Sequence, residues 1–229
     1  MSSIGRRPAA ALAVSVVVIG FPLGESTRAA RHAITLVDPE QPIEEVWERQ
    51  SFGEPTRYRL SEIDGRSVIE ASGQGSAAGL FRDAPLAVID YPIAEWTWRV
   101  DRLPEGGDLR SEKADDVGAS LFLMFGRPGL FRPEPPTLAY AWTSAATPAG
   151  SVVVSPRHPG TLRTIVLQSG GENLGRWISE RRNLIEDYRL AFGEDPPERL
   201  EMIALWSDSD QTGESVHAFY GRMLALRQP

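Results

Sequence analysis

The sequence predicts a mainly β protein, an antiparallel β-sandwich of the jelly-roll type with one helix near residues 178–192. Three observations support this fold class. Hydrophobic residues recur at every second position in many short segments, clusters of Gly and Pro separate these segments, and a single segment has helical spacing. The 229 residues, 41% of them hydrophobic, suffice for one domain of ordinary size. We expect this single β-sandwich domain to span residues 30–229.

The alternation is strongest over residues 94–100, where Trp96 and Trp98 fall on the hydrophobic face. Aromatic residues at such positions belong more often to a core than to a binding surface, so we expect both to be buried. Residues 117–125 are almost wholly hydrophobic, which predicts a central strand covered on both sides. An Asp-Gly pair at 64–65 predicts a tight hairpin. The further expected strands span residues 57–63, 66–71, 138–142, 152–154, 162–168, 200–207 and 216–226.

One segment departs from the strand pattern. Residues 178–192 have hydrophobic side chains near helical spacing, and Gly193 supplies a C-terminal stop, so a helix is predicted there. On such a helix Arg182 and Glu186 are neighbours on the surface. The pair is then either a solvent-exposed ion pair, or Arg181 or Arg182 is free to bind an acidic ligand through its guanidinium fork.

The N-terminal residues have the features of an export signal. Arg6 and Arg7 precede an uninterrupted hydrophobic or small run over residues 9–21, and small residues near position 29 suit a cleavage site. The run is shorter than the roughly 20 residues that a membrane-spanning helix needs. We therefore expect a signal peptide over residues 1–29, no retained transmembrane anchor, and a periplasmic or secreted protein.

The composition excludes several classes of function. Cysteine is absent, so the chain has no disulfide framework, no cysteine nucleophile and no cysteine-ligated metal. Three histidines occur, none at the spacing of local metal ligands, and no P-loop or G-x-S-x-G motif is present. We expect no organic cofactor. The net charge of −7 repels phosphate backbones, so we expect no nucleic-acid partner.

The most informative loop spans residues 207–213, between two predicted strands. It places Asp208, Asp210 and Thr212 at alternate positions before a Gly, and their oxygens can converge on a hard cation such as calcium. Asp116, just before the strand at 117, could complete the carboxylate cluster. The alternative is a turn whose Asp side chains bond the loop's own amides, with Asp116 in a solvated loop.

Several short motifs occur in one order along the chain. They are W-x-W-R at 96–99, D-D at 115–116, Y-x-W at 140–142, S-G at 169–170, W-x-x-E-R-x-N at 177–183, E-D-Y at 186–188, F-G-E at 192–194 and D-x-D-x-T-G at 208–213. Together they resemble the bacterial domain-of-unknown-function family 3047, over roughly residues 46–226. That family is typically exported and has no established activity, so the resemblance supplies no catalytic residue. It implies a shape like the jelly-roll sandwiches of carbohydrate-binding modules, in which an acidic loop before the last strand often holds a structural calcium.

We therefore expect an exported, non-catalytic module that binds a carbohydrate or envelope glycan, with an acidic loop able to hold calcium. The candidate ligand-binding residues are Trp142, Trp177, Arg99, Arg181, Arg182 and Asp187, and the candidate metal ligands are Asp208, Asp210, Thr212 and Asp116. Trp142 and Trp177 lie near predicted loop ends, where aromatic side chains can serve as stacking platforms. Two alternatives stay open, as do the ligand's identity and the oligomeric state. One is a carboxylate-dependent hydrolase of envelope sugars or esters, which needs a cleft holding two acids about 5–10 Å apart; the other is a purely structural envelope protein.

Overall fold

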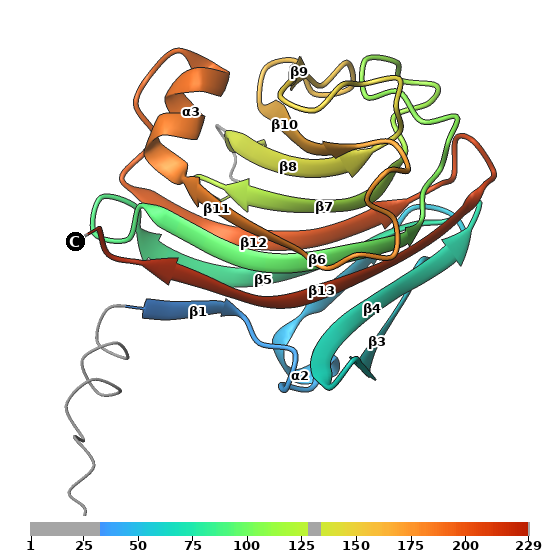
Figure 1. The fold of residues 1–229 in the computed structure, drawn as a ribbon. Coiled ribbons are helices and arrows are strands. Elements are labelled where there is room, and N and C mark those ends of the chain that lie inside the picture. The colour runs from blue at the N-terminus through green and yellow to red at the C-terminus, as the bar shows by residue number, and fades with distance from the viewer. Residues whose placement is uncertain (1–32, 128–133, 229) are drawn as a thin grey trace, which may run out of the picture. The chain divides into compact units, whose positions relative to one another are not determined.

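The computed structural model describes residues 33–127 and 134–228. These residues form mostly β-strands, arranged in two sheets that make a sandwich (Figure 1). The predicted fold class is confirmed. The predicted signal peptide lies outside the described residues. In the described ranges no helix has the length and apolar character to span a membrane.

Sheet A has the strand order β11-β6-β13-β4-β3, and β1 also pairs with β13. Its strands are β1 (Ala33–Val37), β3 (Arg57–Ile63), β4 (Arg66–Gln74), β6 (Ile93–Arg102), β11 (Ile178–Asn183) and β13 (Ser215–Leu226). All its pairs are antiparallel. The predicted hairpin joins β3 to β4, and Asp64 and Gly65 have φ angles of 54° and 72°. Positive φ at both turn positions is what a type I′ turn requires, which explains the Asp-Gly pair.

Sheet B has the strand order β2-β5-β12-β7-β8-β10-β9. Its strands are β2 (Glu48–Ser51), β5 (Ala77–Ala87), β7 (Val117–Met124), β8 (Thr137–Thr143), β9 (Val152–Val154), β10 (Leu162–Ser169) and β12 (Arg199–Asp208). One pair departs from the antiparallel prediction, because β8 and β10 run parallel, with Tyr140 opposite Ile165. The chain makes the required crossover through β9, which pairs antiparallel with the other edge of β10.

Large aromatic side chains from both sheets meet in the core between them. Trp96 and Trp98 on β6 are buried, as predicted. The Trp96 ring centroid lies 5.1 Å from that of Tyr140, and the Trp98 centroid lies 6.2 Å from that of Trp142. These contacts cross from sheet A to β8 of sheet B, so the alternating aromatic residues of two separate strands join the two layers.

The predicted helix over residues 178–192 is correct only in its second part. The helix α3 spans Leu184–Phe192, and the first six residues form β11 instead. Asn183 ends the strand and caps the helix, since its side-chain oxygen accepts hydrogen bonds from the backbone N–H groups of Ile185 and Glu186. Gly193 ends the helix in the left-handed conformation, as predicted. The correction arises because β6 offers β11 a backbone ladder, which local spacing does not reveal.

Some elements carry a weak local pattern and were not expected from the sequence. They are β1, β2, β5 and the single-turn helix α2 (Ile43–Val46). The long strand β5 has an irregular burial pattern because a register shift interrupts its pairing with β12 near Asp83. This irregularity breaks the period of two on which strand prediction depends.

Candidate functional site

An open groove of about 660 Å³ lies over the outer face of sheet B, the face that points away from the core. Along β12 and β7, Leu205 and Leu121 belong to the core, while Trp206 and Phe122 line the groove. Side chains of a strand alternate between its two faces, which produces this division. β7 is a central strand, as expected. Val117 at its start is buried with Leu109 and Val153 in a second hydrophobic cluster, whereas Phe122 and Met124 further along the strand line the groove.

Trp206 is at the centre of an aromatic cluster in this groove. Its ring centroid lies 5.6 Å from that of Phe52, 6.4 Å from that of Phe81 and 5.9 Å from that of Phe122. Gly79 on β5 makes room for the indole, because a Cβ atom there would lie 2.6 Å from Cε3 of Trp206. Phe52 is 57% exposed, so the aromatic cluster remains accessible from solvent.

Three carboxylates meet at one end of the groove. Asp208 is the last residue of β12 and Asp116 immediately precedes β7, and the antiparallel pairing places Asp208 opposite Val117. Asp210 follows in the next loop. Each of the three offers a carboxylate oxygen, and these oxygens all lie within 4.8 Å of one another. The sequence hypothesis that Asp116 joins the carboxylates of the 207–213 loop therefore agrees with the geometry.

The three acids differ in their surroundings. Burial raises the pKa of Asp208 well above its usual range, and the negative charge of Asp116 raises it further. The pKa of Asp210 is also raised, again by partial burial first and by Asp116 second. Asp116 itself accepts hydrogen bonds from the backbone N–H groups of Gln211, at 3.2 Å, and Thr212, at 2.7 Å. Burial and mutual repulsion thus make the ionised forms of Asp208 and Asp210 unfavourable at this end of the groove.

One further oxygen lies at this end of the groove. Among the described residues, Oε1 of Gln211 is buried and has no hydrogen-bond partner, while its Nε2 donates to Oδ2 of Asp210 at 2.8 Å. A buried acceptor without a partner is costly. Beside the carboxylates, Arg157 forms a two-point ion pair with Asp115, at 2.7 and 2.9 Å, and leaves the other three acids without a salt bridge to a described basic residue.

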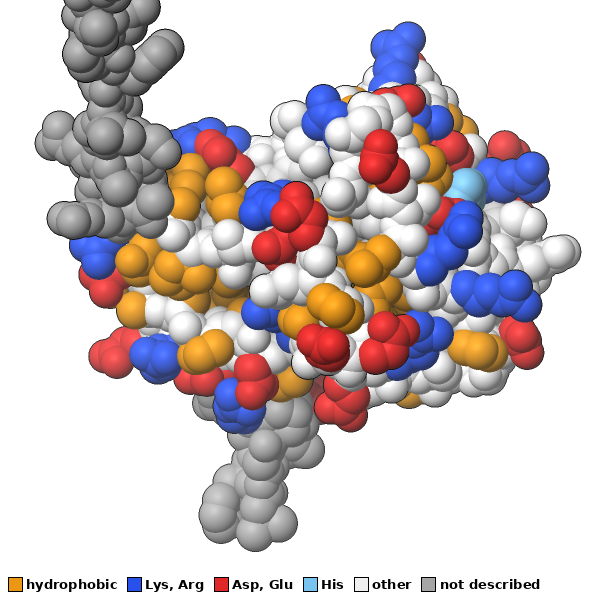
Figure 2. All heavy atoms as spheres, turned by 90° about the horizontal axis from the view of Figure 1, so that it is seen from below, with side chains coloured by type: hydrophobic (Ala, Val, Ile, Leu, Met, Phe, Trp, Pro, Cys, Tyr) orange, Lys and Arg blue, Asp and Glu red, His pale blue; other side chains and the backbone are white. Residues whose placement is uncertain are grey.

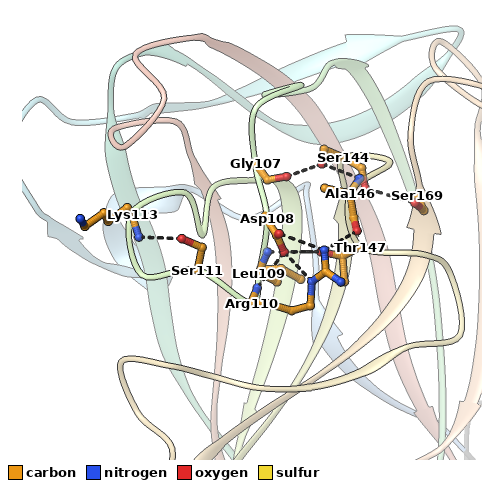
Figure 3. A network of polar contacts seen from close by, with 10 residues as sticks. All are labelled: Gly107, Asp108, Leu109, Arg110, Ser111, Lys113, Ser144, Ala146, Thr147 and Ser169. Atoms are coloured by element: carbon orange, nitrogen blue, oxygen red, sulfur yellow. Dashed lines mark hydrogen bonds and ion pairs between the residues drawn. The ribbon is translucent and has the colours of Figure 1, made fainter.

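A network of polar contacts fixes the loop that brings Asp115 and Asp116 to the groove (Figure 3). Asp108 accepts hydrogen bonds from the guanidinium and the backbone of Arg110 and from the Thr147 hydroxyl. The Ser144 hydroxyl donates to the carbonyl of Gly107. These bonds tie the loop to the segment after β8, so the acids are positioned by structure outside the groove itself.

Thr212 does not present its hydroxyl as the metal-ligand prediction assumed. Its Oγ1 accepts a hydrogen bond from the backbone N–H of Glu214 at 3.3 Å, and its backbone N–H donates to Asp116. Its methyl group lies against Gly106. Thr212 therefore supports the carboxylate of Asp116 through its main chain, and the hydroxyl is engaged in shaping the turn.

The prediction that Trp142 is a stacking platform is wrong. Its side chain is fully buried between the sheets, and its indole N–H donates to the carbonyl of Gly170 at 3.4 Å. Trp142 shares the inward face of β8 with Tyr140. Its position at the end of a strand did not bring it to the surface, because the core extends to that end.

Arg182 and Asp187 form a structural pair inside the fold. Asp187 is 5% exposed and accepts hydrogen bonds from Nε of Arg182 at 2.8 Å and from the Tyr140 hydroxyl at 2.7 Å. Burial raises the pKa of Tyr140, and the charge of Asp187 raises it further. The pair fastens α3 to β8, and ligand binding by these two residues stays a prediction. The predicted Arg182–Glu186 pair is wrong, because Arg182 lies on β11 and pairs with Asp187.

The other predicted ligand-binding residues lie at sheet A, on the opposite side of the core from the groove. Arg99 on β6 holds Asp101 in a two-point ion pair, at 2.6 and 3.0 Å, and Arg181 on β11 pairs with Glu95. The Trp177 indole donates to Asp64 at 3.1 Å. Figure 2, a view of one side of the molecule, likewise shows acidic and basic side chains next to one another.

The aromatic residues of the groove were missed by the sequence reasoning. The sequence pattern singles out Trp142 and Trp177 as surface aromatic residues and assigns Trp206 no role in a site. The available signal was its spacing from Asp208, since two residues that are two positions apart on a strand share a face. Phe52 directly follows β2 and Phe81 lies on β5, and the sequence pattern did not reveal either strand.

The fold and the groove together define a two-sheet β-sandwich with an open, aromatic groove on one sheet. The chain belongs to the family of proteins of unknown function DUF3047, whose family model matches residues 45–224. No curated protein matches the sequence.

Solved structures with a similar fold share little sequence. The glycoside hydrolase domain of Endo-D from Streptococcus pneumoniae R6 has a TM-score of 0.37 and 11% identity, over 78% of this chain and 21% of that one. The mannan-recognising module TmCBM27 has a TM-score of 0.40 and 10% identity, over 86% and 99% of the two chains. The family 30 carbohydrate-binding module of a Clostridium thermocellum cellulase has a TM-score of 0.44 and 9% identity, over 86% and 99%. These likenesses concern the fold alone.

Proposed function

We propose that this protein is an exported, non-catalytic module that binds a neutral carbohydrate in the groove of sheet B. The observation that carries the proposal is the open aromatic cluster around Trp206, with hydrogen-bonding groups at one end of the same groove. A sugar ring has an apolar face that packs on aromatic side chains and hydroxyl groups that bond to carboxylates and amides. Asp210 and Gln211 supply such groups.

The charge of the groove supports a neutral ligand over an acidic one. Asp208 and Asp210 line the groove, and Asp116 lies against them. Without a bound cation, a uronic acid or a phosphate at this end would meet like charges in a partly buried setting, which is unfavourable. The basic and hydrophobic start of the sequence supports export, and we propose a periplasmic or extracellular location, where the ligand would be an envelope or environmental glycan.

Affinity gel electrophoresis with soluble mannan, xylan and mixed-linkage β-glucan tests this proposal, with alginate as an acidic comparison. We expect retardation by at least one neutral polysaccharide and none by alginate. Trp206→Ala should weaken the retardation about 30-fold or more, because truncating a central aromatic contact costs about 2 kcal/mol or more. Trp177→Ala, on sheet A, is the matched control and should leave it unchanged. Absence of retardation by every neutral polysaccharide would overturn the proposal and favour a purely structural envelope protein.

We also propose that the acidic end of the groove holds a structural calcium ion. Carboxylate oxygens of Asp116, Asp208 and Asp210 and the unpartnered amide oxygen of Gln211 are the ligand types that calcium prefers. A divalent cation would offset the repulsion between Asp208 and Asp116. Thermal unfolding in calcium and in EGTA tests this part, since a ligand that binds only the folded state raises the melting temperature. Equal melting temperatures in calcium and in EGTA would overturn the proposed calcium site.

The hydrolase alternative keeps one observation in its favour. Asp208, whose pKa is raised, and Asp210 both line the groove, so an acid–base pair is available there. If the wild-type chain releases reducing sugar from the same polysaccharides and Asp210→Asn does not, the protein is a hydrolase and the non-catalytic proposal is wrong. The non-catalytic proposal expects no release by either protein.

A further inference from the structure

A β-bulge lies directly behind the aromatic cluster. Between β12 and β7, Trp206 is opposite Ser120 but Asp208 is opposite Val117, so two residues of β7 face the single residue Ser207. A bulge interrupts the regular hydrogen bonding of a sheet and redirects the neighbouring side chains. Here it lies between the two residues, Trp206 and Asp208, that bring the aromatic and the acidic ends of the groove together.

Hydroxyl groups from beyond the core bond the main chain at this bulge. The Tyr220 hydroxyl, from β13 of sheet A, donates to the carbonyl of Trp206 at 2.6 Å and accepts from the backbone N–H of Ser120 at 3.3 Å. It also lies 2.8 Å from Oγ of Ser207. A phenol has one proton, and the shortest bond takes it, so Ser207 donates to Tyr220. A single side chain of sheet A thus bonds both strands of the bulge.

Tyr58 and Thr56, two positions before it, complete the arrangement. The Tyr58 hydroxyl, from β3, donates to the carbonyl of Ala78 at 2.7 Å and accepts from the backbone N–H of Ser207 at 3.0 Å. The Thr56 hydroxyl donates to the carbonyl of Ser207 at 2.8 Å. All three side chains are buried. Main-chain groups in a dry interior need partners, and these hydroxyls supply them where the ladder is irregular.

We infer that Tyr220, assisted by Tyr58, is a positioning residue that sets the orientation of Trp206 in the groove. The effect of this residue on ligand binding rests on the proposed function, whereas the orientation of Trp206 does not depend on that function. Removing the Tyr220 hydroxyl leaves the carbonyl of Trp206 and the amide of Ser120 without this partner, so the bulge relaxes and the indole moves. The binding surface of sheet B is then held in place by side chains of sheet A.

Fluorine NMR on the full chain labelled with 5-fluorotryptophan tests the inference without any ligand. The chain has six tryptophans, and the resonance lost in Trp206→Phe identifies Trp206. Tyr220→Phe should move or broaden that resonance by more than its line width at a temperature where the variant is folded. A Trp206 resonance at the wild-type position in folded Tyr220→Phe would overturn the inference.

Tyr140→Phe is the matched control, because it also removes a buried hydroxyl from the sandwich interior. Its ring lies 5.1 Å from Trp96, so we expect the Trp96 resonance to move and the Trp206 resonance to stay. A shift of Trp206 in both variants would indicate a general loosening and overturn the inference. Should Tyr220→Phe fail to fold, Ser207→Ala removes one bond of the same arrangement. It should also move or broaden the Trp206 resonance, and an unmoved resonance there would overturn the inference.

The link to function has its own readout. With a neutral polysaccharide that retards the wild-type chain, Tyr220→Phe should bind about tenfold more weakly and Tyr140→Phe as tightly as wild type. If no polysaccharide retards the wild-type chain, the proposed function fails while the NMR result still decides the positioning role. Wild-type affinity in Tyr220→Phe with a shifted Trp206 would overturn the importance of that orientation for binding.

Discussion

The outer faces of sheet A and sheet B both carry tryptophan, phenylalanine, arginine and aspartate, yet these side chains are partnered differently. On sheet A the Trp177 indole bonds Asp64, and the guanidinium of Arg66 lies 5.6 Å from the centroid of its ring. Arg99 holds Asp101 and lies 5.6 Å from the centroid of the Phe219 ring. Aromatic faces and charges on this side therefore satisfy one another.

Sheet B leaves comparable groups available. Trp206 contacts phenylalanine rings, and three acids at the end of the groove lie beside one arginine, which pairs with Asp115. The comparison teaches that residue type does not define a binding surface in this fold. Among the described residues, a surface becomes a candidate site where the fold leaves carboxylates without an opposite charge beside an accessible aromatic cluster. Residue type alone does not distinguish Trp206 from Trp177.

Among the substitutions that test this difference between the sheets, Asp208→Asn should have the largest effect on stability. In EGTA the variant should unfold at a higher temperature than the wild-type chain, because it removes a buried charge next to Asp116 and keeps the oxygen that accepts from Val117. Calcium at about 100 times its dissociation constant should stabilise the wild-type chain by about 2.7 kcal/mol and the variant by much less.

Asp101→Asn on sheet A is the control for that experiment. It breaks a partly exposed ion pair with Arg99, so we expect a small loss of stability and an unchanged response to calcium. Calorimetry with and without calcium measures both variants. Destabilisation of Asp208→Asn by the same amount in calcium and in EGTA would contradict the proposed metal role and favour a structural one.

Substitution of one glycine on each sheet should have an effect of intermediate size on stability. A Cβ atom at Gly79 on sheet B would lie 2.6 Å from Trp206, and one at Gly221 on sheet A would overlap the Thr97 hydroxyl. Both Gly→Ala changes overpack the protein and should cost about 1–3 kcal/mol in unfolding experiments with urea. Gly79→Ala alone should weaken polysaccharide retardation, and equal retardation of the two folded variants would argue against the groove as the binding surface.

The smallest effect concerns pH. Bonding to Arg110 lowers the pKa of Asp108 to about 2, although burial opposes the shift. A lowered folded-state pKa contributes stability that is present above the ordinary value of 3.8 and is lost as the pH falls toward 2. Because the pair is largely exposed, the contribution should be below about 1 kcal/mol.

Urea unfolding of Asp108→Asn and of the wild-type chain at pH 5 and pH 2.5 measures the stability that this ion pair contributes. The stability difference between the two proteins should shrink at the lower pH. Asp208 should show the opposite sign in EGTA, since its raised pKa favours the protonated folded state and stability is lost as the pH rises. A constant difference for Asp108→Asn would show that the loop in Figure 3 does not depend on this ion pair.

Local pattern was sufficient where one strand or one turn carried the information. The positive φ angles at 64–65, the buried Trp96 and Trp98 and the C-terminal stop at Gly193 all follow from short-range rules. The start of α3 does not follow from such rules, because residues 178–183 pair as a strand with β6. The position of Trp142 does not either, since burial at a strand end depends on what the other sheet places against it.

The sequence by itself determined that this chain forms strands, which residues alternate across them, and which loop is acidic, because these properties depend on neighbours a few positions away. The tertiary structure decided which outer face stays open. Asp116 meets Asp208, and Tyr220 reaches Trp206, only after strands distant in sequence have paired and the two sheets have packed. Pairing and packing join residues far apart in the chain, and a pattern read along the sequence contains no record of which strand will lie beside which.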